Sequence, residues 1–182
     1  VVIPNWNGKK YLRVCLASLR RQTHNNLEII VVDNASEDDS VKFLKEKYPN
    51  INVISHEHNL GYGAANNSGL KVAKGEYLFF LNNDTRLDPN CIEELLKSIE
   101  SNKNYGACAS KILLEQENNI LDVAGMAICL DGLSIGRGRL ESADKFNEEE
   151  EVFCASGCAS FYKKETLEDI GLVNEVYDED FF

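Results

Sequence analysis

The chain has 182 residues, 43% of them hydrophobic, and a formal net charge of −11. That length and composition allow one domain with a full core, and no apolar run reaches the roughly 18 residues of a membrane-spanning helix. The acidity argues against nucleic acid or an anionic membrane surface as the main partner. The charge of an anionic ligand would have to be met locally, by a metal ion, helix N-termini or a few Lys and Arg side chains.

Strands and helices alternate in the first half of the sequence. Apolar runs predict strands at residues 1–4, 27–33, 51–55 and 77–81. Helical spacing and capping signals predict helices in the intervals, at residues 9–22, from Ser36 to before Pro49, at 64–73 after a turn at 61–63, and from the pair Asp88–Pro89 onward. This order predicts a doubly wound, mostly parallel sheet with right-handed crossovers.

The second half, after Tyr105, has a less regular pattern. Strands are predicted at residues 107–114, 120–130 and 151–162, with a short helix at 163–170 and glycine turns at Gly125, Gly132, Gly136, Gly138 and Gly157. Since no low-complexity linker or internal repeat interrupts the sequence, we expect one domain over residues 1–182. The start within a strand and the apolar end indicate a piece of a longer protein.

Two of the predicted strands end in polar clusters. Asp33 follows one strand, and Asn82, Asn83 and Asp84 follow another. Because ligands bind beyond the carboxyl ends of the strands in open α/β sheets, both clusters are expected at one crevice. Asp84 with Asn82 could hold Mg²⁺ or Mn²⁺ across a diphosphate, since these ions prefer oxygen ligands, or the cluster could be a turn that caps the strand. Asp33 could accept hydrogen bonds from a base or a ribose, or it could cap the next helix.

Several other chemistries are disfavoured by the sequence. The glycines at 61–63 depart from a dinucleotide-binding fingerprint, because Asn66 stands in place of the third glycine and the motif follows the third strand. There is no phosphate-binding P-loop and no Gly-x-Ser-x-Gly elbow. The run of glutamates at 148–151 is expected to be a solvated loop rather than a calcium site.

The cysteines and histidines lack the spacing of a metal site. Most of the six cysteines are expected to be reduced core residues rather than zinc ligands or disulfide partners, and His24, His56 and His58 are expected to be surface residues. Glycosylation sequons begin at Asn34, Asn66 and Asn83, in or beside the proposed crevice, where a glycan would block it. These features favour a cytoplasmic location.

Taken together, the motifs resemble glycosyltransferase family 2, a family of inverting transferases with the GT-A fold. The matching segments are residues 4–8, 15–19, 32–36, 59–67, 81–85, 155–159 and 170–172. Their order and spacing make the resemblance more specific than any one motif. The pattern is most similar to the rhamnosyltransferase-type subgroup, which builds bacterial polysaccharides on lipid-linked acceptors.

The resemblance implies a Rossmann-like, mostly parallel central sheet flanked by helices, followed by an irregular mixed second half. Residues 1–104 would bind the nucleotide sugar, and residues 105–182 would form an acceptor side that is incomplete at its C-terminus. A UDP- or dTDP-linked donor would bind with Mg²⁺ or Mn²⁺ across its diphosphate. A hydroxyl of a saccharide or lipid-linked acceptor, deprotonated by a carboxylate, would attack the anomeric carbon. Membrane association would come only through the acceptor, at the inner face of the membrane, or through regions outside this sequence.

The resemblance also assigns roles to single residues. Asp33 would contact the base, Asn83 would lie near the ribose, and Asp84 would hold the metal. Asn82 would be a second and weaker metal ligand, because it stands where the family has Asp. Gly157 and its neighbours would approach the donor sugar or the acceptor. The full set expected to bind the nucleotide sugar is Pro4, Asn5, Asp33, Asn59, Gly63, Asn83 and Gly157.

The catalytic base is not assigned to a residue of this sequence. In the family it is the Asp of a Glu-Asp pair, and residues 178–182 best match the segment upstream of that pair, which places the base beyond Phe182. The other alignment makes Glu179 and Asp180 the pair itself.

Two alternative functions stay open on the sequence alone. A non-catalytic nucleotide-sugar-binding module would explain Asn82 in place of Asp and the missing base. A nucleotidyltransferase that makes activated sugars would need a glycine-rich loop with Arg and Lys after the first strand, which residues 4–10 do not supply.

Overall fold

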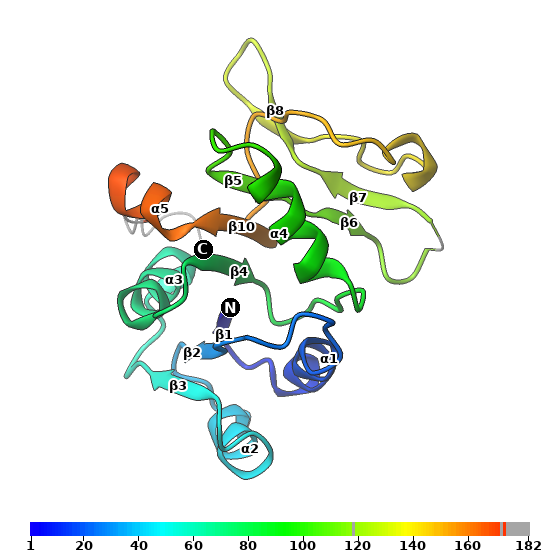
Figure 1. Ribbon diagram of the computed structural model, residues 1–182. Helices are drawn as coiled ribbons and strands as arrows, with labels where there is room; N and C mark the ends of the chain where they lie inside the picture. Colours follow the sequence, from blue (N-terminus) through cyan, green and yellow to red (C-terminus); the bar gives the residue numbers. More distant parts are fainter. Residues whose placement is uncertain (118, 172, 174–182) are drawn as a thin grey trace.

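The computed structural model describes residues 1–117, 119–171 and 173. At its centre lies a six-stranded sheet with the strand order β3-β2-β1-β4-β10-β5 (Figure 1). Neighbouring strands β3, β2, β1 and β4 pair in parallel, and β10 pairs antiparallel with both β4 and β5. The strands are β1 (Val2–Asn5), β2 (Ile30–Asp33), β3 (Asn52–Ser55), β4 (Tyr77–Leu81), β5 (Ala107–Ala109) and β10 (Ala159–Lys163). The expected mostly parallel sheet is confirmed.

Helices cover both faces of this sheet. They are α1 (Lys9–Leu19), α2 (Ser40–Lys47), α3 (Gly61–Val72), α4 (Cys91–Ser101) and α5 (Lys164–Ile170). Apolar side chains of α1, α2 and α4 form one core with Ile3, Val31 and Phe79 of the sheet. On the opposite face, α3 and α5 pack over Val2 and Phe80. Because successive strand residues face opposite sides and both sides are covered, the strands are nearly continuous apolar runs.

Three predicted helix starts differ from the structure. α2 begins at Ser40 rather than after Ser36, because the Ser36 hydroxyl accepts hydrogen bonds from Asn7 and Asn5 instead of capping the helix. α4 begins at Cys91, two residues later than the pair Asp88–Pro89 predicts.

The third difference is the start of α3, because the glycines at 61–63 are not a turn before this helix but its first residues. Gly61 has a φ of 82°, a left-handed conformation that a residue without a side chain adopts at little cost, and it brings the chain into the helix.

The second half is built from short strands. β6 (Lys111–Leu113) pairs with β7 (Leu121–Ala124), and β8 (Met126–Ile128) pairs with β9 (Ser134–Gly136), each as a separate two-stranded sheet. The strands predicted at 107–114 and 120–130 are therefore each divided in two, at Ser110 and at Gly125, which has a φ of 76°. The strand predicted at 151–162 is confined to β10, and a 3₁₀ turn (Ala143–Lys145) precedes it.

The cysteines and histidines are less uniform than the sequence predicts. All six cysteines are free thiols, but Cys15 alone is buried, Cys154 is exposed and the other four are half-buried. His56 is not a simple surface residue, because its ring nitrogens hydrogen-bond Asn34 Oδ1 at 2.7 Å and Ser68 Oγ at 3.0 Å. The glutamates at 148–151 are exposed, as expected. Within the described ranges, no helix has both the length and the apolar character to span a membrane.

Candidate active site

The candidate residues gather where three neighbouring parallel strands end. Asn5 is the last residue of β1 and Asp33 the last of β2, and these two residues lie opposite each other in the strand register. β4 ends at Leu81, so Asn82, Asn83 and Asp84 lie in the turn beyond the strand. Asn82 and Asp84 are therefore oriented by the backbone of the turn, and not by the alternation of side chains along a strand.

A hydrogen-bonded network joins the three strand ends. The Asn5 amide Nδ2 donates to Asp33 Oδ2 at 2.8 Å, and Asn83 Nδ2 donates to Asn5 Oδ1 at 2.7 Å. The backbone N–H of Ser36 donates to the second carboxylate oxygen of Asp33 at 2.9 Å. Asp33 is 1% exposed and Asn5 2% exposed, so the buried carboxylate is held by these donors. Asn5, Asp33 and Asn83, all predicted from the sequence, thus form one hydrogen-bonded unit, in which Asn5 and Asp33 are buried and Asn83 is half-buried.

Gly8 leaves the space that this network occupies. A Cβ atom on Gly8 would lie 2.2 Å from Asn83 Nδ2 and 2.5 Å from Asn5 Oδ1, the two atoms that form the bond between β1 and the turn after β4. Any side chain at this position would push the amides apart. The glycine is therefore required for the packing of the site.

Asp84 is the side chain best placed to hold a cation. Its carboxylate is exposed, and in the part of the chain that the structure describes it has no hydrogen-bond or ion-pair partner. No group of three or more His, Cys, Asp or Glu side chains gathers among the described residues. Mg²⁺ and Mn²⁺ fit this arrangement nevertheless, because they take one or two protein oxygens and fill the other positions with phosphate and water.

Asn82 is held through its backbone. Its N–H donates to the carbonyl of Cys158 at 2.8 Å, and its carbonyl accepts from Thr85 Oγ1 at 2.8 Å. The turn that carries Asp84 is thereby fixed to the loop that leads into β10. This contact brings the second half of the chain to the end of β4.

Two thiols lie close to this turn. Burial, with smaller contributions from the charges of Asp84 and Asp122, raises the pKa of Cys158 to about 11. Burial likewise raises the pKa of Cys15 to about 11, against a lowering hydrogen bond with Thr85. Without a bound metal, both thiols are therefore protonated at neutral pH. Asp122, which forms an ion pair with Arg139 at 2.6 Å, is an additional carboxylate near the site.

The N-terminal turn of α3 forms the wall on the β2 side. Asn34 Nδ2 donates to the carbonyl of Gly61 at 3.0 Å, and Asn59 Oδ1 accepts from the N–H of Gly61 at 2.9 Å. Gly63 is buried within the same turn. The hydroxyl of Tyr62 donates to the carbonyl of Gly157, which ties this wall to the loop before β10.

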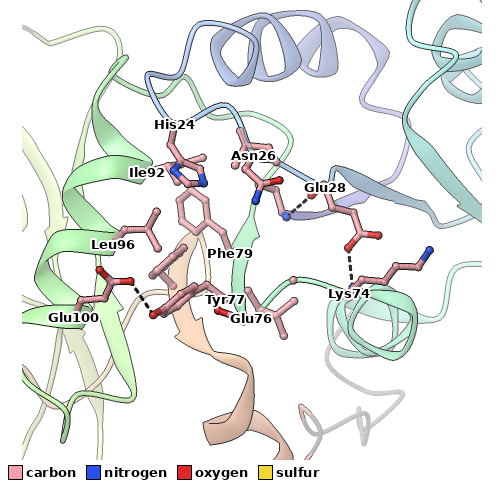
Figure 2. A pocket seen from close by; sticks show the side chains of 16 residues that line it. His24, Asn26, Glu28, Lys74, Glu76, Tyr77, Phe79, Ile92, Leu96 and Glu100 are labelled. Atoms are coloured by element: carbon pink, nitrogen blue, oxygen red, sulfur yellow. Dashed lines mark hydrogen bonds between the residues drawn. The ribbon is translucent and has the colours of Figure 1, made fainter.

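A sizeable hollow lies elsewhere, at the amino ends of the strands (Figure 2). It has a volume of about 630 Å³ and is lined in part by His24, Glu28, Tyr77 and Glu100. The Tyr77 hydroxyl donates to Glu100 there at 3.0 Å. Among the described residues that line this hollow, none belongs to the candidate site, so size alone does not identify the functional cleft.

The sequence model of the family described as "Glycosyl transferase family 2" matches residues 1–171. The chain belongs to glycosyltransferase family 2. Glycosyltransferase GlyG of Streptococcus pneumoniae is 30% identical over 141 residues, which are 74% of this chain and 46% of that protein. The glycosyltransferase YibD of Escherichia coli K12, named as uncharacterized, is 35% identical over 112 residues, 59% of this chain and 32% of that one. The chain thus spans less than half the length of these relatives.

Solved structures of glycosyltransferases show the same fold. The mannosyltransferase PcManGT of Pyrobaculum calidifontis, in complex with GDP-Man and Mn²⁺, aligns with a TM-score of 0.68 at 17% identity, covering 96% of this chain and 46% of that one. Residues 1–349 of TarS from S. aureus, in complex with UDP-GlcNAc, align with a TM-score of 0.64 at 20% identity, covering 93% and 46%. The GT-A fold expected from the sequence is confirmed.

Within this family 2 chain, the predicted residues fall into linked groups. Asn5, Asp33 and Asn83 are directly bonded, and Pro4 precedes them on β1. Asn59 and Gly63 lie at the start of α3, Asn82 and Asp84 in the turn after β4, and Gly157 in the loop before β10. The segments that would carry a catalytic base, at residues 179–180 or beyond 182, lie outside the described residues.

Four further residues shape the site without having been singled out as candidates. They are Gly8, Ser36, Tyr62 and Cys158. All four lie within segments that match the family motifs, and this is the sequence signal for them. The specific contacts of Tyr62 and Cys158 join residues 95 and 76 positions apart, and no local pattern indicates those contacts.

Proposed function

We propose that this chain is the donor-binding part of an inverting family 2 transferase of the rhamnosyltransferase-like subgroup. It moves a sugar from a nucleotide-diphosphate donor to a hydroxyl of a saccharide or lipid-linked acceptor in cell-surface polysaccharide synthesis. The observation that carries the proposal is the hydrogen-bonded Asn5–Asp33–Asn83 network beside the exposed carboxylate of Asp84. The PcManGT complex with GDP-Man and Mn²⁺ supports a donor and a divalent metal in this fold.

The donor lies across the carboxyl ends of β2, β1 and β4. Pro4, Asn5 and Asp33 line its nucleotide end, and Asn59 and Gly63 form the adjacent wall of α3. A fixed, buried network suits this role because pre-organised groups bind a ligand without having to be ordered first.

Asp84, with Asn82, holds Mg²⁺ or Mn²⁺ at the diphosphate. The metal neutralises charge on the leaving nucleotide. The chain has a net charge of −11, so a bound metal is a simple source of positive charge beside the diphosphate.

The two halves of the chain bind different substrates. Residues 1–104 bind the UDP- or dTDP-linked donor, and residues 105–182, as one domain with them, form part of the acceptor side. The base that deprotonates the acceptor hydroxyl is the Asp of a Glu-Asp pair, either residues 179–180 or a pair beyond Phe182. Six free thiols favour a cytoplasmic location, where thiols stay reduced.

One observation favours a non-catalytic nucleotide-sugar-binding module as the second candidate. Asn82 stands at a position where a carboxylate would bind a metal more strongly, and both backbone groups of Asn82 are committed to other contacts. Such a module binds the donor and transfers nothing.

The test is calorimetric titration of the protein with UDP, dTDP and GDP, each with Mn²⁺ and with a chelator. We expect one nucleotide to bind only with metal, and Asp84→Asn to weaken that binding at least about tenfold, since a carboxylate ligand is lost. Asp131→Asn, on an exposed turn far along the chain, is the matched control and keeps full affinity. Absence of binding to all three nucleotides contradicts the proposal.

A transfer assay then separates the two candidates. The longer protein that contains this chain, incubated with a donor whose nucleotide binds, releases nucleotide and glycosylates acceptor if it is a transferase. Tight binding without any turnover would favour the binding module.

A further inference from the structure

Tyr62 and Gly157 meet across the candidate site. Tyr62 lies in the first turn of α3, and its hydroxyl donates a hydrogen bond to the carbonyl of Gly157 in the loop before β10. A Cβ atom on Gly157 would lie 3.3 Å from this hydroxyl and 3.6 Å from the ring carbon that bears it. The tyrosine ring thus lies against the bare peptide of the glycine.

Each side of this contact is anchored to a different strand end. On one side, Asn34 and Asn59 hold the Gly61 peptide and with it the start of α3. On the other side, the Cys158 carbonyl accepts from the N–H of Asn82, in the turn that carries Asp84. Tyr62 therefore connects the β2 side of the site with the β4 side.

The loop between Ser156 and Ala159 is compact. The Cys158 N–H donates to Ser156 Oγ at 3.3 Å, and the Ala159 N–H donates to the Ser156 carbonyl at 3.2 Å. Within this turn, the Gly157 carbonyl is directed toward α3 and is occupied by the tyrosine hydroxyl. Removing the hydroxyl leaves that carbonyl without this donor, so the peptide can turn.

We propose that Tyr62 is a positioning residue that holds the Gly157 peptide for the sugar of the donor, and so determines affinity for the sugar rather than for the nucleotide. This inference rests on the proposed function. A donor that lies from Asp33 toward Asp84 presents its sugar beyond the diphosphate, on the side of the loop that Asn82 fixes. Tyr62 is 37% exposed, so it is accessible at the surface beside the Gly157 loop that it contacts.

The test compares Tyr62→Phe with the unchanged protein, using nucleotides and their sugars as paired probes. With Mn²⁺ present, we titrate UDP against UDP-N-acetylglucosamine, GDP against GDP-mannose, and dTDP against dTDP-rhamnose. For the pair that binds, Phe keeps the ring but loses the hydroxyl, so affinity for the free nucleotide stays within about twofold. Affinity for the nucleotide sugar falls about tenfold, the effect of one hydrogen bond.

Tyr77→Phe is the matched control. It also removes one hydroxyl hydrogen bond, from Tyr77 to Glu100 at 3.0 Å, but at the opposite end of the sheet. We expect it to leave both affinities unchanged. Equal weakening of nucleotide and nucleotide sugar by Tyr62→Phe would overturn the inference, because it would indicate a general loosening of the site.

A second substitution tests the contact itself. Gly157→Ala places a methyl group against the tyrosine hydroxyl, and Tyr62→Phe removes that closest atom. We therefore expect Gly157→Ala to weaken nucleotide-sugar binding more in the unchanged protein than in the Tyr62→Phe background. Strictly additive effects would contradict a direct interaction.

The outcomes separate this inference from the proposed function. If the unchanged protein binds none of the six probes, the proposed function fails, and the role of Tyr62 fails with it. If the unchanged protein binds and Tyr62→Phe binds the nucleotide sugar equally well, the proposed function stands and the positioning role alone is wrong.

Discussion

The two halves of the molecule place functional residues in different ways. In the first half, Asn5 and Asp33 end strands that are buried on both faces, and their amide and carboxylate groups are bonded to one another. In the second half, Gly157 lies in a loop that is held by Tyr62 and, through the next residue, by Asn82. The first arrangement is fixed by the core, and the second depends on a few individual contacts. Recognition of a constant ligand suits the first, and adaptation to varied ligands suits the second.

The two halves also differ in how densely large apolar side chains are exposed to solvent. Seven large ones belong to the stretch from β6 to the loop before β10, namely Leu113, Ile128, Leu130, Leu133, Ile135, Leu140 and Phe153. Strands β5, β6, β8 and β9 have three residues each. Little apolar surface is removed from water here, so this region contributes less to the stability of the fold.

The largest difference should appear when one phenylalanine is removed from each half. Phe79, 1% exposed in β4, packs edge-on against Phe161, and Phe79→Ala should lower the free energy of unfolding by about 3–5 kcal/mol. Phe153 is 66% exposed, and Phe153→Ala should change the free energy of unfolding by less than about 0.5 kcal/mol. Urea unfolding measures both. Similar losses from the two variants would show that the second half has a core as well packed as the first.

The reactivity of two thiols, Cys154 and Cys158, should show how the environment differs within the single loop before β10. Burial raises the pKa of Cys158 from 9.0 to about 11, which reduces its thiolate fraction roughly 100-fold, whereas Cys154, four residues earlier, is exposed. Iodoacetamide at pH 8 should therefore alkylate Cys154 first. Peptide mass spectrometry follows the rates, and Cys15 and Cys91, whose pKa burial also raises to about 11, are internal references. Rapid alkylation of Cys158 would mean that its contact with Asn82 opens readily.

Breaking the amide network should affect both stability and binding. Asn5→Ala removes the donor to Asp33 and leaves a buried carboxylate with one partner fewer, so we expect a loss of about 1–3 kcal/mol in the free energy of unfolding. Nucleotide binding should fall with it. Asn26→Ala, at an exposed position near the opposite end of the sheet, is the control. Unfolding midpoints and titrations on the same samples measure the two effects, and a variant that binds normally would separate the network from the donor site.

The smallest effect concerns Asp38, which accepts from the first N–H groups of α1 and α2 at 2.8 and 3.1 Å. Burial alone would raise its pKa, but hydrogen bonds from Ser40 and Lys9 outweigh burial and lower it. The folded state therefore releases this proton more readily than the unfolded state does, and the resulting stability is present above about pH 4 and lost as the pH falls through the folded pKa.

Asp38→Asn keeps an oxygen acceptor but removes the negative charge beside the two helix N-termini, so it should cost about 0.3–1 kcal/mol at pH 7. The difference from the unchanged protein should shrink in acid. Urea unfolding at pH 7 and pH 3 measures it, and a constant difference at the two pH values would contradict the role of the charge.

The sequence predicts the first half of the fold well because its apolar runs coincide with buried strands. The strand predicted at residues 77–81 has the observed bounds, and the one predicted at 27–33 starts three residues early. Helix starts are less predictable, because a capping residue can bond elsewhere. Ser36 bonds Asn5 and Asn7 of another loop, and so it does not begin α2.

In the second half the same reasoning fails for a physical reason. Leu113 and Leu130 are apolar and yet exposed, so their pattern does not report burial, and the predicted strands are too long. The site was predicted where polar residues follow strands, as at Asp33 and Asp84. The bond between Tyr62 and Gly157 could not be predicted, because it joins elements whose distance in space the sequence does not encode locally.

The antiparallel strand β10 has a consequence for how such a chain can diversify. Ala109 of β5 lies opposite Ser160 of β10, and the Ser110 N–H donates to the Ala159 carbonyl, so residues 110–158 leave the sheet and return to it at adjoining points. When the two ends of a segment are held together, each doubling of its length raises the free energy of loop closure by only about 0.6 kcal/mol. A lineage with this architecture can therefore exchange the whole of residues 110–158 while the central sheet keeps its strand order.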